Sequence, residues 1–265
     1  MAFRSANLAL HMIRFNSAVS SDFLDTYNRI VDDEIISKNE GPKQRTFAPS
    51  QMRCDRVSWF RLRGVEPDKV KQPDRGLTFT ADIGVACHEN IQNKLIKYLG
   101  EDWVTVQQWV DVNPEFFKDY DMTLDTSRGN ETLIELRKPF PVRFACDGII
   151  RFQNKVRLLE IKTSEYNSWN DLVEPKPKHM DQIKCYSTLL NIPDVLFLYQ
   201  ERNYGECKCF EVTVSTAEQE ELRTRMTKVM ELAEACIAPD GLPIGDDWCS
   251  PSMCPYYAKC KEWGR

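Results

Sequence analysis

Three charged residues, Asp147, Glu160 and Lys162, stand in two short apolar segments where charges are uncommon. The segments CDGIIRF and KVRLLEIKTS have the pattern of two strands joined by a tight turn. With a two-residue turn at 153–154, counting back along the strands places Asp147 opposite Glu160 on the same face of the hairpin. A turn at 154–155 pairs Asp147 with Lys162 instead, so either turn gathers the three charges at one place.

Two carboxylates that oppose each other across a strand pair repel, and burial without compensation shifts a pKa rather than leaving both ionised. Mg²⁺ or Mn²⁺ would relieve this repulsion, because these ions prefer oxygen ligands and bind through one or two carboxylates together with substrate phosphate. Such an ion activates water and neutralises charge on a phosphate, while Lys162 orients the water or stabilises the leaving charge. The pattern therefore predicts a phosphodiester-cleaving site, and the structural alternative is a lysine-bridged ion network at a sheet edge.

Two further motifs stand before and after the hairpin. Gly84 and His88 share one face of a helix predicted over residues 82–99, beside its apolar stripe. Gln182 and Tyr186 have the same four-residue spacing in the first helix predicted after the hairpin. A single histidine in such a position is usually structural, so the functional interpretation depends on the order of all the motifs.

In this order the motifs resemble those of the PD-(D/E)XK nuclease superfamily, and most of all its RecB-like branch. The resemblance covers residues 49–262. It implies a restriction-endonuclease-like fold and metal-dependent hydrolysis of DNA. The implied site residues are His88, Asp147, Glu160 and the Ile161 carbonyl around Mg²⁺ or Mn²⁺, with Lys162, Glu160 and Asp147 as the catalytic group and Gln182 and Tyr186 contacting DNA or positioning the phosphate.

The chain has ten cysteines and no secretory signal, which favours metal or cluster ligation over disulfides. Cys249, Cys254 and Cys260 form a C-x(4)-C-x(5)-C group in the tail, and three thiolates require a fourth. Cys54 is the remaining candidate, since Cys207 and Cys209 are too close together to complete a zinc ribbon and should share one strand face. The other cysteines are predicted to be small buried residues: Cys87, Cys146, Cys185 and Cys236.

Iron–sulfur nucleases of the RecB-like branch have one cysteine far upstream and three near the C-terminus, around a [4Fe-4S] cluster that joins the two ends of the domain. The chain is similar in this respect to CRISPR-associated adaptation nucleases and to phage and eukaryotic iron–sulfur exonucleases. The resemblance implies that Cys54, Cys249, Cys254 and Cys260 hold such a cluster. Four residues separate Cys249 from Cys254, where the family usually has two, so the role of Cys249 stays open.

The expected fold is an α/β core with a central mixed sheet, helices on both faces, and N- and C-terminal segments joined by the cluster. Residues 1–48 should form an N-terminal helical extension and 49–265 the nuclease domain, with its cysteine-rich tail at 249–260. The predicted helices are 20–37, one from about 50, 82–99, 179–190 and 215–236, the predicted strands are 103–112, 131–152, 156–163, 194–200 and 207–214, and DTSRGN at 125–130 is a candidate flexible insertion.

A net charge of −5 disfavours a surface covered with nucleic-acid contacts, but a local basic segment lies between residues 53 and 75. Arg53 and Arg56, beside Cys54, are expected to contact DNA, with aromatic rings such as Trp59 stacking on a single strand. No run is long and apolar enough for a membrane span, so an intracellular protein is expected, cytoplasmic, or organellar or nuclear in a eukaryote.

The predicted function is therefore an exonuclease on single-stranded DNA ends, with DNA as the partner and no membrane. The alternative is a non-catalytic DNA-binding or partner-docking subunit of a recombination or CRISPR adaptation complex, against which the intact Asp147, Glu160 and Lys162 speak. Proteins of recombination, replication or CRISPR adaptation are the expected protein partners. An RNA substrate stays open, because metal–phosphate chemistry does not itself read the 2′-hydroxyl.

Overall fold

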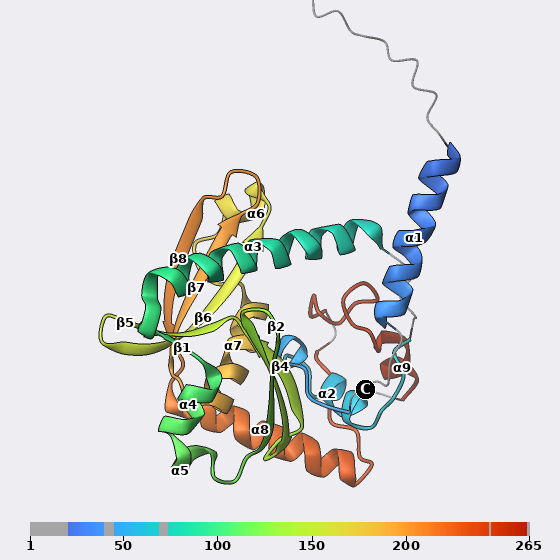
Figure 1. Cartoon of the computed structure of the whole chain (residues 1–265). Helices are drawn as coiled ribbons and strands as arrows, with labels where there is room; N and C mark the ends of the chain where they lie inside the picture. Colours follow the sequence, from blue (N-terminus) through green and yellow to red (C-terminus); the bar gives the residue numbers. More distant parts are fainter. Residues whose placement is uncertain (1–20, 40–44, 69–73, 244, 264–265) are drawn as a thin grey trace, which may run out of the picture.

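The computed structural model describes residues 21–39, 45–68, 74–243 and 245–263 (Figure 1). Its helices are α1 (Ser21–Asn39), α2 (Asp55–Leu62), α3 (Arg75–Leu99), α4 (Val106–Val112), α5 (Pro114–Phe117), α6 (Tyr166–Asn170), α7 (Pro177–Leu190), α8 (Thr216–Glu234) and α9 (Tyr257–Glu262), with 3-10 turns at Pro49–Gln51 and Gly100–Asp102. Its strands are β1 (Trp103–Val104), β2 (Asp121–Arg128), β3 (Glu131–Lys138), β4 (Val142–Cys146), β5 (Gly148–Phe152), β6 (Lys155–Ser164), β7 (Asp194–Glu201) and β8 (Cys207–Thr213).

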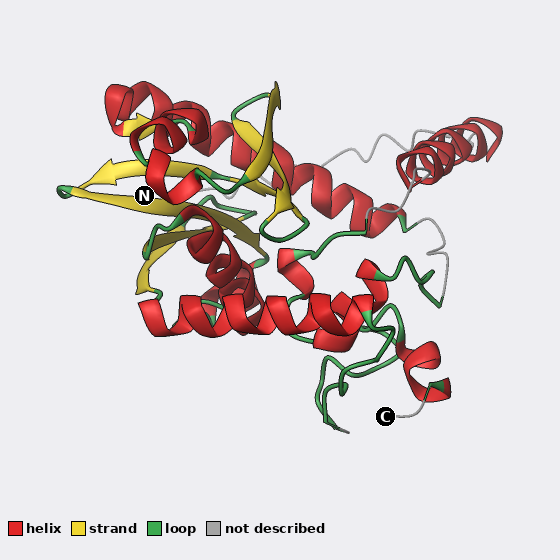
Figure 2. Ribbon diagram, turned by 90° about the horizontal axis from the view of Figure 1, so that it is seen from below, coloured by secondary structure: helices red, strands yellow, loops and turns green. Residues whose placement is uncertain are grey.

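The strands of the described residues form two sheets. One is five-stranded with the order β1-β5-β6-β7-β8, in which β6 and β7 are parallel and the other pairs antiparallel. The other is an antiparallel sheet of β2, β3 and β4. The helix α3 crosses one face of the mixed sheet, and α7 and α8 cover the other (Figure 1, Figure 2). The predicted α/β fold with a central mixed sheet flanked by helices is thus confirmed.

Side-chain alternation along β6 decides which layer each residue faces. Leu159 and Ile161 belong to the smaller apolar cluster beneath α3, whereas Leu158 belongs to the larger cluster that α7 and α8 line. Glu160 and Lys162 have the same parity as Leu158 and share its face. The sheet therefore supplies both charges to the α7 side, at the edge of the main core.

The β5–β6 hairpin has the predicted two-residue turn. Phe152 pairs with Lys155, and the turn residues Gln153 and Asn154 have φ values of 51° and 61°, as a type I′ turn requires. The ladder runs back to Gly148 opposite Leu159, so the next pair is Asp147 and Glu160. This register confirms the pairing predicted for the two carboxylates.

The single strand predicted over 131–152 is wrong, because the chain forms three strands there and changes sheet at Asp147. The strand predicted over 103–112 ends at Val104, since Thr105 and Gln108 form a reciprocal capping box that starts α4. The DTSRGN segment is not an insertion loop, because it forms the end of β2 and the turn into β3.

The N-terminal part of the chain enters the core before the predicted boundary at residue 49. Phe47 is 1% exposed, and its amide donates to Pro141 O beside a parallel bridge to Val142. Further upstream, Arg75 of α3 makes two hydrogen bonds with the Asp32 carboxylate of α1, at 2.7 and 2.6 Å. The helical extension is thus fastened to the long helix that carries His88.

None of the helices in the described ranges is long and apolar enough to cross a membrane.

Gly148 follows the sheet change and packs against an indole ring. A Cβ atom at this position would lie 2.7 Å from Cη2 of Trp103, which is closer than carbon atoms can approach. Trp103 lies on β1, which pairs with β5. The absence of a side chain at Gly148 allows the indole ring to cover the start of β5.

The cysteines outside the tail divide into two groups. Cys146 and Cys185 are buried and Cys87 is half-buried, which agrees with their predicted packing role. Cys236 is exposed and has a φ of 59° in the turn after α8, so its predicted burial is wrong. Cys207 and Cys209 share one face of β8, as predicted, and both are exposed.

The turn predicts a stability difference between two substitutions at Asn154. Asn154→Val places a β-branched residue at a left-handed backbone conformation and should cost about 1–2 kcal/mol, which lowers Tm by about 2–8 °C. Asn154→Gly is the matched control and should leave Tm unchanged or raise it, because glycine adopts this conformation without strain. Calorimetric scans of both variants measure the difference, and an equal Tm for the two would contradict the turn geometry.

Candidate active site

Asp147 is held on two sides at the point where β4 ends and β5 begins. Its Oδ2 atom accepts a hydrogen bond of 2.6 Å from the Ile161 amide, and its carbonyl oxygen accepts one of 2.8 Å from Nε2 of Gln92. Gln92 is buried and lies one turn after His88 on α3. The carboxylate therefore has a fixed orientation, with Oδ1 directed toward the helix.

His88 brings α3 to this carboxylate. Its Nδ1 atom lies 3.6 Å from Oδ1 of Asp147 and 3.7 Å from Oε1 of Glu131. The ligand atoms of these three residues lie within 4.8 Å of one another, a spacing that suits one metal ion. Gly84, one turn earlier on the same helix face, lies against Thr163 of β6.

Glu160 and Lys162 form the other half of the site. Glu160 is 1% exposed, and the Lys162 ammonium group is at ion-pair distance from its Oε1. Lys162 is the ion-pair partner of this carboxylate among the described residues. Burial, reinforced by the charge of Asp147, raises the pKa of Glu160 to about 7.

The two cationic groups remain charged at neutral pH. Burial lowers the pKa of His88, but its interactions with Asp147 and Glu131 outweigh burial and raise the pKa to about 9. Burial likewise lowers the pKa of Lys162, and the attraction of Glu160 and Asp147 outweighs it, so the net shift is upward. The site thus contains three carboxylates, and the positive charges that compensate them are those of one histidine and one lysine.

A hard divalent cation fits this arrangement. Glu160 is a buried carboxylate beside Asp147, and the ligand atoms of His88, Glu131 and Asp147 lie within 4.8 Å of one another. Carboxylate oxygens and imidazole are donors that Mn²⁺ accepts, and Mg²⁺ takes the oxygens. The predicted Ile161 contributes its amide to Asp147, so its part in the described contacts is to position the carboxylate.

Gln182 and Tyr186 lie one turn apart on α7, and their side chains bond to each other. Nε2 of Gln182 donates a 2.7 Å hydrogen bond to the hydroxyl of Tyr186, and the Tyr186 ring is buried and stacked on Phe144 at 4.7 Å. Burial, reinforced by the charge of Glu160, raises the pKa of Tyr186 well above its usual value. Tyr186 is thus a buried residue whose hydroxyl is bonded to Gln182, and the role of the pair in contacting DNA or positioning the phosphate stays a prediction.

The structure also corrects two expected DNA contacts, those of Arg56 and Trp59 on α2, whereas the contact of Arg53 stays a prediction. Arg56 is buried, and its guanidinium donates to Pro239 O at 2.8 Å and to Sγ of Cys260 at 3.6 Å. Trp59 is 1% exposed and its Nε1 donates to Leu232 O, so its ring cannot stack on a strand. Arg53 lies 3.2 Å from the Asp246 carboxylate in an ion pair that leaves it partly exposed. These side chains fasten α2 to α8 and the tail.

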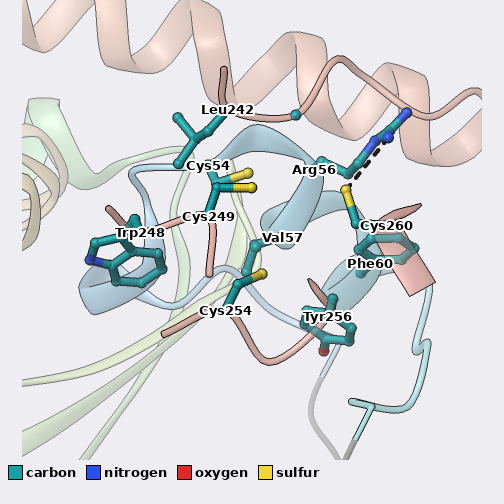
Figure 3. Close-up of a pocket in the computed structure, with 11 residues that line it drawn as sticks. Cys54, Arg56, Val57, Phe60, Leu242, Trp248, Cys249, Cys254, Tyr256 and Cys260 are labelled. Atoms are coloured by element: carbon teal, nitrogen blue, oxygen red, sulfur yellow. Dashed lines mark hydrogen bonds between the residues drawn. The ribbon is translucent and has the colours of Figure 1, made fainter. Parts of the chain in front are cut away.

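The four cysteines predicted as ligands line one pocket between α2 and the C-terminal tail (Figure 3). Cys54 precedes α2, Cys260 lies on α9, and Cys249 and Cys254 stand on the irregular segment between α8 and α9. None of the four is part of a disulfide among the described residues. The remaining pocket wall is largely apolar, with Val57, Phe60, Leu242, Trp248 and Tyr256.

The spacing of these thiols bears on what they could hold. Burial, reinforced by the nearby Cys54, Cys249 and Cys260, raises the pKa of Cys254 to about 11. Within the described part of the chain, however, the set of three or more ligand atoms within 4.8 Å of one another is the His88 group and not these cysteines. A single zinc ion has Zn–S distances of about 2.3 Å and holds thiolates within about 4.6 Å of each other. No three of these thiols in the described structure therefore stand at the spacing of an occupied zinc site.

Glu131 is missing from the predicted site, although a signal for it exists in the sequence. In the β3–β4 ladder Leu136 pairs with Val142 and Thr132 with Cys146, so Glu131 comes next to Asp147 by the same counting that pairs Asp147 with Glu160. The turn residues KPFP at 138–141 mark this second hairpin. Treating 131–152 as one strand hides it.

No protein-family model matches the chain, and no curated protein matches its sequence. The crystal structure of SSO0001 is similar with a TM-score of 0.47 and 13% identity, over 87% of this chain and 98% of that one. An alkaline exonuclease (LHK-Exo) from Laribacter hongkongensis has a TM-score of 0.37 and 12% identity, over 77% of this chain and 93% of that one. Its complex with dAMP gives 0.36 and 14%, with the same shares covered. At these TM-scores the chemistry has to be inferred from the side chains.

The protonation of the site predicts how metal affinity depends on pH. An ion that takes His88 and Glu160 as ligands must displace their protons, which are bound with pKa values of about 9 and about 7. Affinity for Mn²⁺ should therefore rise from about pH 6 to about pH 9, with proton release on binding. Titration calorimetry in two buffers of different ionisation enthalpy measures both quantities. His88→Asn should lose the part of the rise above neutral pH, and a pH-independent affinity in the unmodified protein would contradict the ligand set.

Proposed function

We propose that the chain is a metal-dependent nuclease that hydrolyses phosphodiester bonds in DNA, as an exonuclease on single-stranded ends. The observation that carries this proposal is the buried Glu160 carboxylate, which lies in the field of Asp147 and has Lys162 as its ion-pair partner among the described residues. A purely structural ion network would satisfy both carboxylates with hydrogen bonds and counter-charges. Two neighbouring carboxylates beside further ligand residues, with one lysine next to them, instead favour a binding site for a cation.

The side chains divide the chemistry between them. His88, Glu131 and Asp147 offer ligand atoms for one ion, and Glu160 offers an adjacent carboxylate. When bound, Mg²⁺ or Mn²⁺ would supply Lewis-acid chemistry at the phosphodiester. Lys162 keeps its proton and is held against Glu160, so its charge lies where it orients the attacking water or stabilises charge on the leaving oxygen.

The choice of DNA and of strand ends follows from the family resemblance and from what the site contains. The side chains of the site would bind a metal ion and phosphate oxygens, and contacts to phosphate carry no information about the base sequence. Degradation from an end requires no base recognition, whereas cleavage at a chosen sequence does. Proteins of recombination, replication or CRISPR adaptation are the partners that such an activity would serve.

We also propose that Cys54, Cys249, Cys254 and Cys260 hold a [4Fe-4S] cluster. All four line one largely apolar pocket, and Arg56 donates to the Cys260 sulfur, which would stabilise a thiolate ligand (Figure 3). Such a cluster would join α2 to the tail across 195 residues of chain between Cys54 and Cys249. Its role in this proposal is structural.

Substitutions at the metal site test the nuclease proposal. Glu160→Gln and Asp147→Asn should each abolish cleavage of end-labelled single strands in Mg²⁺ or Mn²⁺, because each removes a negative charge that the ion requires. Strand binding in EDTA should survive, since the loss of a carboxylate reduces repulsion of phosphate. Glu206→Gln, an exposed carboxylate on the turn before β8, is the matched control and should retain full activity.

Lys162→Ala should lower kcat by at least about tenfold with little change in Mn²⁺ affinity, because its charge acts in the transition state. Both label polarities should be followed, since they distinguish attack at the 5′ end from attack at the 3′ end. Substantial cleavage by both carboxylate variants would overturn the metal-site proposal. Strand binding without any cleavage by the unmodified protein would support the non-catalytic alternative.

Iron content tests the cluster. Anaerobically purified protein should be brown, with broad visible absorbance and iron and sulfide near four per chain, as a [4Fe-4S] cluster contains. Cys54→Ala, Cys254→Ala, Cys260→Ala and Cys249→Ala should each lose iron and lower Tm, because the cluster closes a long loop.

Cys87→Ala and Cys236→Ala are the matched controls and should keep iron, since neither residue lines the pocket. Full iron in Cys249→Ala together with loss in a control variant would show that the ligand set is wrong. Stoichiometric zinc without iron or sulfide in the unmodified protein would overturn the cluster and leave a zinc site in its place.

A further inference from the structure

A basic segment at the start of α7 lies at the edge of the active site and is not used by the chemistry proposed above. Its residues are Lys176, Pro177, Lys178 and His179. The Lys176 amide donates a 3.2 Å hydrogen bond to the hydroxyl of Tyr199, and Nδ1 of His179 lies 2.7 Å from the same oxygen. Tyr199 pairs with Lys162 across the β6–β7 ladder. The segment is thus fastened to the strand next to the proposed catalytic lysine.

The tyrosine hydroxyl fixes the protonation of His179. Its oxygen accepts from the Lys176 amide, and among the described atoms the acceptor for its single hydrogen is Nδ1 of His179. We therefore assign the neutral tautomer, in which the proton is on Nε2. Burial, followed by the charges of Lys162, Lys178 and Lys176, lowers the pKa of His179 to about 3, which agrees with this assignment. His179 is a fixed neutral donor.

The lysines of this segment lie close to other positive charges. Burial and the charges of Lys176 and Lys162 lower the pKa of Lys178, so the three ammonium groups feel one another. Glu160 compensates Lys162, but Lys176 and Lys178 have no carboxylate at ion-pair distance within the described ranges. Elsewhere Lys155 and Lys184 have such partners, Asp194 and Glu218. An anion would relieve the repulsion of the unpaired lysines.

We propose that Lys176, Lys178 and His179 together bind one backbone phosphate of the nucleic-acid strand, next to the phosphodiester at the metal site. The proposal rests on the nuclease function. Point charges and a neutral donor recognise phosphate oxygens, and the nearby Tyr199 ring is buried and offers no platform for a base. The contact is therefore sequence-independent and holds the strand in position for cleavage.

The salt dependence of strand binding tests the lysines. In the Glu160→Gln background, binding of a labelled single-stranded oligonucleotide in EDTA is measured by fluorescence anisotropy over a series of KCl concentrations. Lys176→Gln with Lys178→Gln should weaken binding and reduce the slope of log K against log[KCl] by about 0.7, the value for one phosphate on a single strand. Lys118→Gln with Lys228→Gln is the control with the same charge change at distant exposed positions, and its slope should not change.

His179→Ala should weaken binding several-fold with an unchanged slope, because a neutral donor displaces no counterion. His179→Gln keeps a neutral donor and should retain part of the affinity, and Tm of each variant excludes unfolding as the cause. The proposal is wrong if the double lysine variant binds the strand with the same affinity and the same salt slope as its parent. It is also wrong if His179→Ala reduces the slope of log K against log[KCl]. If the unmodified chain cleaves DNA but the double lysine variant keeps the affinity and slope of its parent, this phosphate subsite is refuted and the nuclease function stands. If the double lysine variant shows the reduced slope but the unmodified chain does not cleave DNA, the nuclease function is refuted and the subsite stands.

Discussion

The hydrogen bond from the Ile161 amide to the Asp147 carboxylate is the contact on which the site depends. Asp147 is the single residue between β4 and β5, so this bond ties the point where the chain leaves one sheet to the central strand of the other. The bond lies one residue beyond the last pair of the β5–β6 ladder, Gly148 and Leu159. It also orients the second oxygen toward His88, and through it the long helix α3 is set against the sheet.

The helix α2 packs against both α8 and the C-terminal tail. Trp59 bonds to the end of α8, Phe60 stacks on Tyr256 at 5.0 Å, and Arg56 reaches the loop before the tail. Farther along, the Asp68 carboxylate accepts from the first amides of α9. Basic residues that a sequence would assign to a nucleic-acid surface therefore serve to hold two distant parts of the chain together.

Strand alternation and turn length were sufficient to predict the hairpin and the pairing of Asp147 with Glu160, because both depend on local geometry alone. Glu131 required the recognition of the second hairpin, which the turn residues KPFP mark, and of the change of sheet at Asp147, which no local pattern marks. Arg56 and Trp59 show another limit, since their burial depends on a tail that packs on α2 only in the folded chain. Thr105 shows a third, because its capping box with Gln108 overrides the β-branched composition that favours a strand.

The contact between Gly148 and the ring of Trp103 has a consequence for how this sequence changes over generations. A side chain at 148 would displace the indole, whose edge lies where a Cβ atom would be, and with it β1 beside the aspartate. A smaller residue at 103, by contrast, leaves only a void, which a later side chain at 148 can fill. Substitution is therefore ordered: position 103 must change first, and lineages that retain the tryptophan are confined to glycine.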